Sequence, residues 1–172
     1  DKDQTYHAKY RAAICSYRLL RIDDGLAYLN ELIEDELYYD SLGVLNLAVA
    51  RGYELDEDLL QAEEAYAEVA NTTEDQKLAS RAFYRLGLIY QFDYDQLARA
   101  KEYYDKAVQA NRMTDEAEDA LQRSSDIGKL DEFAHATLDT NATQSAIDDA
   151  AYTQYLLAEL YWLSLNKPDS GI

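Results

Sequence analysis

The most constraining feature of this sequence is a spacing of small and large residues that recurs three times. In each case a small residue is followed four positions later by a large apolar one, and three positions further by another apolar or small one. The three sets are Gly25/Leu29/Leu32, Ala62/Tyr66/Val69 and Ala100/Tyr104/Ala107. Residues at these spacings share one face of an α-helix, so each set predicts a helix that a neighbouring helix approaches closely at its small residue.

A second series of small residues recurs with a period of 34 to 39 residues. Its members are Ala13, Ala48, Gly87, Ser124 and Ala158. A period of this size is the signature of a helical repeat, in which each unit buries its apolar face against its neighbours. The longer intervals require short insertions, one of which we place around residues 52–56.

Helical periodicity covers almost the whole chain. It predicts helices at 3–20, 23–36, 41–52, 57–70, 74–91, 95–110, 114–127, 129–139 and 145–165. Residues 114–139 are also compatible with one long helix, which Thr114 would cap. Only six glycines and one proline are present, too few turn residues for a β-rich protein of 172 residues. The sequence therefore predicts an all-α fold.

The best-defined unit lies at residues 81–110 and resembles a tetratricopeptide repeat (TPR). The resemblance rests on Phe83-x2-Leu86-Gly87-x2-Tyr90 followed by Ala100-x3-Tyr104-x2-Ala107, and on Leu157-Ala158-x2-Tyr161 followed by Asn-Lys-Pro-Asp. It implies a right-handed α-solenoid of antiparallel helix pairs, about four and a half repeats in a single domain over 1–172. The proline that closes such a repeat is absent after Ala107. The abundant tyrosines and the Asn-Lys-Pro-Asp turn also resemble bacterial cell-envelope members of the family.

The resemblance implies a binding groove lined by the first helix of each repeat. Its lining positions lie six and three residues before each small residue, and one and four after it. We take as candidate partner-binding residues Tyr10, Tyr17, Arg81, Tyr84, Leu88, Gln91, Tyr152, Tyr155, Glu159 and Trp162. The remaining lining positions are His7, Ile14, Leu42, Leu45, Val49, Gly52, Glu118, Leu121, Ser125 and Gly128. The alternative for the apolar members is that they pack between helix pairs.

The net charge of -18 bears on the choice of partner. Such a chain repels nucleic acid and anionic membrane, and it suits a protein or peptide with a basic flank. Solubility or life at high salt would explain the charge equally well. No stretch reaches the roughly 18 apolar residues of a membrane helix, so we expect no membrane insertion. The compartment stays open between the bacterial cytoplasm and the periplasm or cell envelope.

Signals for catalysis are weak. Six scattered glycines supply no phosphate-binding loop, His7 and His135 lack the spacing of paired metal ligands, and Cys15 is the only cysteine. We expect Cys15 to be packed, and we expect no enzymatic activity, metal or cofactor. The favoured function is a protein-interaction scaffold. The alternative is a structural assembly subunit that self-associates through its terminal repeat, and an all-helical enzyme comes third.

The C-terminal helix at 145–165 carries aromatic residues on more than one face, including Tyr155 and Trp162. One preceding helix cannot cover them all, so we expect an exposed apolar patch here. Either the natural protein continues into further repeats, or two copies pack through this helix. In both cases the chain should tend to dimerise, and Trp162→Glu should weaken that tendency.

Overall fold

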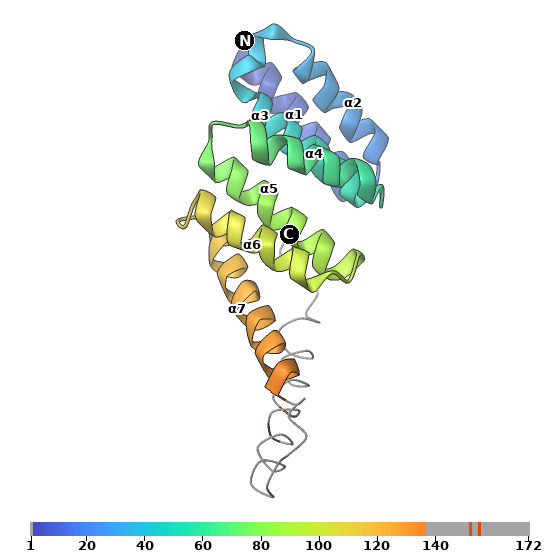
Figure 1. Ribbon diagram of the computed structural model, residues 1–172. Coiled ribbons are helices and arrows are strands. Elements are labelled where there is room, and N and C mark those ends of the chain that lie inside the picture. The colour runs from blue at the N-terminus through green and yellow to red at the C-terminus, as the bar shows by residue number, and fades with distance from the viewer. Residues whose placement is uncertain (1, 137–151, 153–154, 156–172) are drawn as a thin grey trace, which may run out of the picture.

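The computed structural model describes residues 2–136 together with Tyr152 and Tyr155 (Figure 1). Among these residues the chain is helical, without a strand. The elements are α1 (Lys2–Arg18), α2 (Ile22–Ile33), the 3-10 helix η1 (Glu36–Ser41), α3 (Leu42–Leu55), α4 (Leu59–Thr72), α5 (Gln76–Leu88), the π-helical turn η2 (Ile89–Asp93), α6 (Leu97–Ala110) and α7 (Asp115–Ala136). The predicted all-α class is confirmed.

Consecutive helices pack against one another along the chain. Figure 1 shows α1 with α2, α3 with α4 and α5 with α6 as successive pairs, after which α7 departs at an angle. The apolar core forms three clusters, one within the first pair and α3, one between the second and third pairs, and one among α5, α6 and α7. Each cluster therefore lies between sequence neighbours, as expected of a chain built from local units.

The predicted helices up to residue 110 all exist, with ends displaced by at most three residues. Residues 115–136 form the single long helix that was the alternative to two shorter ones. Thr114 caps it as predicted, because the Thr114 hydroxyl accepts a hydrogen bond from the Ala117 backbone N–H at 3.1 Å. The predicted helix at 145–165 lies outside the described residues except at Tyr152 and Tyr155.

Both series of small residues lie where helices meet. All nine residues of the three 4,3-spaced sets are buried, as are Ala13, Ala48, Gly87 and Ser124, whereas Ala158 lies outside the described residues. The ring of Tyr17 lies directly over Gly25, and the ring of Tyr104 lies directly over Gly87. The small residues therefore make room for an aromatic ring of the partner helix within the same pair.

The three helix pairs share one turn. Leu20, Glu57 and Asp95 each adopt positive φ, at 56°, 61° and 51°, and each lies five residues before the small residue of the following helix. At the first turn, the Arg21 N–H donates to the Ser16 carbonyl and the Leu20 N–H to the Tyr17 carbonyl. The equivalent bonds occur at the second turn, so both helices end in a Schellman motif.

The uneven repeat period arises in the first helix of each pair. The left-handed turn residue follows the small residue by seven positions in the first pair, nine in the second and eight in the third. Helix α3 absorbs two additional residues before its turn, within the predicted insertion at 52–56. In the third pair the additional residue falls within η2, where the Tyr94 N–H donates to the Ile89 carbonyl five residues back. A π turn is the form in which a helix accommodates one inserted residue.

The Leu20 turn gives a test of this geometry. Leu20 has a left-handed backbone, which is strained for a residue with a side chain. Because 80% of its surface is exposed, the side chain gains little packing energy to offset that strain. We expect Leu20→Gly to stabilise the fold by about 0.5–1 kcal/mol, the relieved strain exceeding the added freedom of the unfolded chain. Chemical denaturation measures the change, with the neighbouring Leu19→Gly as the control that should not stabilise. Equal effects at both positions would contradict the left-handed turn.

Candidate functional site

The candidate binding residues divide into exposed and buried groups. Arg81, Tyr152 and Tyr155 are exposed, and Tyr10 is half-buried. Tyr17, Tyr84, Leu88 and Gln91 are buried, each with 5–6% of its surface exposed. Glu159 and Trp162 lie outside the described residues. For the apolar members among the buried four, this is the alternative stated from the sequence, because their side chains pack between helices and not on an open groove. Gln91, which that alternative did not cover, is buried with them.

Tyr17 is buried because its ring fills the space between α2 and α3. It contacts Gly25 and Gly52, and its hydroxyl donates to the Ala48 carbonyl at 3.2 Å. Burial raises the pKa of the Tyr17 phenol, with smaller contributions from Tyr53 and Tyr10. The role of Tyr17 is therefore to join the first pair to the second.

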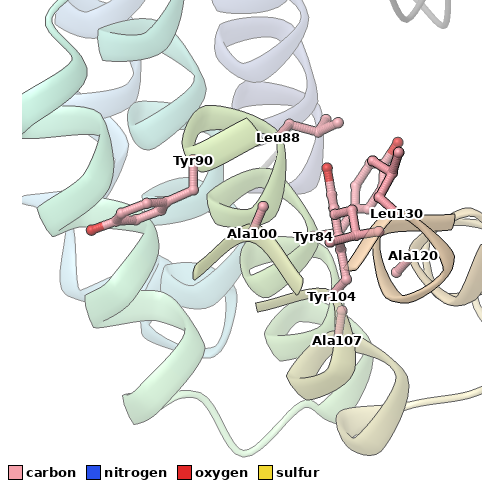
Figure 2. Close-up of a cluster of buried hydrophobic side chains, with 9 residues drawn as sticks. Tyr84, Leu88, Tyr90, Ala100, Tyr104, Ala107, Ala120 and Leu130 are labelled. Atoms are coloured by element: carbon pink, nitrogen blue, oxygen red, sulfur yellow. The ribbon is translucent and has the colours of Figure 1, made fainter. Parts of the chain in front are cut away.

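Tyr84 and Gln91 belong to a polar network within the α5–α6–α7 core. The Tyr84 hydroxyl donates to Asp119 Oδ2 at 2.5 Å, and the Tyr104 hydroxyl donates to Gln91 Oε1 at 2.6 Å. Figure 2 shows the Tyr84 and Tyr104 rings beside Ala120 and Leu130 of α7, while Tyr90 points away from them. Leu88 lies in the same cluster. These residues hold α7 in place and leave little surface for a partner.

Tyr10 of α1 lies close enough to Arg81 of α5 to be influenced by its charge, although 71 residues separate them. Burial raises the pKa of the Tyr10 phenol, Tyr6 raises it further, and the positive charge of Arg81 partly offsets both. Arg81 also forms an ion pair with Glu116 of α7, in which Nε and Oε1 are 3.0 Å apart. The Arg81–Glu116 ion pair therefore joins the first helix of the third pair to the start of α7.

An open hollow lies along α7. The hollow is lined by Asp115, Glu118, Asp119, Leu121, Gln122 and Ser125. Glu118, Leu121 and Ser125 are lining positions given by the repeat, and all three are exposed. Leu121 leaves 58% of its surface in solvent. Three of the predicted lining positions are therefore exposed together on one stretch of α7.

A second polar cluster, centred on Glu54, had no signal in the sequence. Glu54 pairs with Arg51, whose Nη1 is 2.6 Å from Oε1, and with Arg85, and it accepts a hydrogen bond from the Tyr66 hydroxyl at 2.6 Å. Burial raises the pKa of the Glu54 carboxyl, although Arg51 and Tyr66 oppose this. Nearby, burial and the charge of Glu57 raise the pKa of Asp93. Since both arginines are engaged by Glu54, the cluster ties α3, α4 and α5 together.

The described residues also bear on the cysteine, on metal binding and on membrane insertion. Cys15 is exposed, so the predicted packing of its thiol is wrong. It lies on the solvent side of α1, whereas Ala13 and Ser16 are on the buried side. Within the described part of the chain, no group of three His, Cys, Asp or Glu residues is placed to hold a metal ion. Of the helices that the structure describes, none combines the length and apolarity needed to cross a bilayer.

Comparison with known proteins does not identify a family. No family model matches the chain, and searches of curated proteins and of solved structures found no match either. The resemblance to tetratricopeptide repeats therefore stays a prediction from the sequence.

Proposed function

We propose that this chain is a helical-repeat scaffold of the tetratricopeptide type, a right-handed stack of antiparallel helix pairs that binds a protein or peptide partner. The main support is the recurrence of one unit: three pairs share the left-handed turn, the small residue five positions later and the aromatic or leucine side chain that follows. A chain built this way aligns its first helices side by side and presents one extended surface.

The binding surface is formed by exposed and half-buried side chains of those first helices and of α7. Tyr10, Arg81 and Leu121 are its members within the described helices, and Tyr152 and Tyr155 extend the same lining positions. Aromatic side chains and arginine give large contact area for little lost conformational freedom, which makes them frequent anchors of protein interfaces. Catalysis has less support, because Tyr66, Tyr84 and Tyr104 use their buried hydroxyls in hydrogen bonds to Glu54, Asp119 and Gln91.

Site-specific photo-crosslinking tests this proposal. A photoreactive residue replaces Tyr10, Arg81 or Leu121 in turn, and the same residue replaces Tyr28 or Leu60, exposed on the second helices α2 and α4, as controls. In an extract of the source cells, we expect the three test positions to capture the same partner protein and the two controls not to capture it.

Two outcomes would contradict the scaffold function. Adducts only with a second copy of the chain would support the self-associating assembly subunit instead. Equal capture at test and control positions would show that the first helices are not the binding surface.

A further inference from the structure

Helix α7 has one packed face and one open face. Ala117, Ala120 and Ile127 are buried against α5 and α6. The opposite side carries Glu118, Leu121 and the rest of the hollow, and no helix among residues 2–131 packs over it. The open side therefore combines an apolar residue with charged ones in a concave surface.

The charges on this side are negative and partly uncompensated. Glu116 pairs with Arg81, and Asp119 accepts hydrogen bonds from Tyr84 and from Arg123, whose Nε lies 2.6 Å away. Asp115 and Glu118 make no ion pair or hydrogen bond with another described side chain. The positive end of the helix dipole accounts for Asp115 in the first turn. It also accounts for Glu118, which lies in the same first turn, but not for the exposed Leu121 one turn later.

Three kinds of segment could occupy the hollow: the chain's own residues 145–165, a second copy of the chain, or a basic segment of another protein. Their charges distinguish them. The chain's own segment 145–165 contains Asp148, Asp149 and Glu159 and neither Lys nor Arg, and a second copy of the chain brings a net charge of -18. The segment therefore has no cation to offer Asp115 and Glu118, and a second copy would be repelled by its net charge. A basic segment does the reverse, and complementary charge of this kind both accelerates encounter and selects against wrong partners.

We propose that the open side of α7 docks a basic partner segment, with an apolar side chain on Leu121 and lysine or arginine side chains on Asp115 and Glu118. The inference rests on the proposed scaffold function and specifies the class of its partner. The Arg81–Glu116 pair bounds the site on the α5 side, so a bound segment lies along α7 and toward the first helices.

Designed peptides provide the test with the full chain. Three 18-residue amphipathic helices share one apolar face and carry lysine, glutamine or glutamate on the polar face. Fluorescence anisotropy at 50 mM salt measures their affinities. We expect the lysine peptide to bind at least tenfold more tightly than the glutamine peptide, the glutamate peptide not to bind, and raising the salt to 300 mM to remove most of the difference.

Matched variants separate local docking from attraction to an acidic protein. Glu118→Lys should weaken the lysine peptide about tenfold, whereas Glu102→Lys, an exposed position of α6 with the same change in net charge, should leave the affinity within about twofold. Leu121→Ala should weaken it about fivefold, whereas Leu60→Ala should not.

The remaining outcomes overturn the inference in distinguishable ways. Equal effects of Glu118→Lys and Glu102→Lys would reduce the binding to net charge. A photoreactive residue at Leu121 that links to residues 145–165, or to a second copy, would show that one of these covers the face. If the lysine peptide does not bind while photoreactive residues at positions 10 and 81 still capture a common partner, the prediction of a basic partner is wrong and the scaffold function stands. If no position captures a partner, both fail.

Discussion

Replacing Gly87 by alanine is expected to destabilise the fold by about 2–3 kcal/mol, and replacing it by leucine should prevent folding. A Cβ at this position would lie well inside contact distance of the Tyr104 ring. That ring cannot move aside, because it is fully buried, contacts Tyr84 at 6.0 Å between ring centroids and is held through its hydroxyl by Gln91. The cost therefore reflects a close approach of α5 and α6 and not helix propensity.

Gly128 provides the matched control, since it also lies inside a helix. An added Cβ there would meet Lys101 Cε at 3.8 Å, which is ordinary contact. Gly128→Ala should stabilise the protein by about 0.5–1 kcal/mol, the gain expected when alanine replaces glycine in a helix. Chemical denaturation of both variants measures the two effects. Destabilisation at both positions, or at neither, would show that the small residue of the repeat has no special packing role.

The packing of the helix pairs was predictable from the sequence because it depends on local spacing. A small residue at Ala62 or Ala100 and a large one four positions later lie on one helix face whatever the rest of the chain does. The same reasoning gave the place of the short insertion near residue 52. It did not give the π turn, because an additional residue can be absorbed in a helix or in a loop, and the sequence does not distinguish the two.

The binding positions were harder to predict, because a lining position and a packing position share the same residue types. Tyr17 and Tyr84 suit either kind of position. For Tyr17, the glycines that its ring contacts, Gly25 and Gly52, are the sequence feature that could have indicated burial. Leu121 was given by the repeat spacing, but its exposure depends on the departure of α7 from α6. The Glu54 cluster joins residues up to 31 positions apart on three helices, and abundant acidic residues gave no means of selecting this one.

Glu54 should matter more to stability as an acceptor than as a charge. Its side chain is 15% exposed and receives the hydroxyl of the fully buried Tyr66 and the guanidinium groups of Arg51 and Arg85. We expect Glu54→Ala to lower the free energy of unfolding by about 2–3 kcal/mol. The loss is smaller than for a fully buried ion pair, because Arg51 and Arg85 both reach solvent. Glu54→Gln should cost about 1 kcal/mol or less, since its amide oxygen still accepts from Tyr66.

The pH dependence of the same variants tests the balance between burial and pairing. Because burial raises the pKa of Glu54 above its ordinary value of 4.5, the folded state binds the proton more readily than the unfolded state. Stability contributed by this group therefore rises as the pH falls from above the raised pKa towards 4.5. Glu54→Gln cannot titrate, so the advantage of the wild type over this variant should widen over that interval. Glu64→Gln, at an exposed position of α4, removes one carboxylate outside this cluster and serves as the control. An advantage that instead narrows on acidification would mean that the two arginines outweigh burial and hold the pKa of Glu54 below its ordinary value.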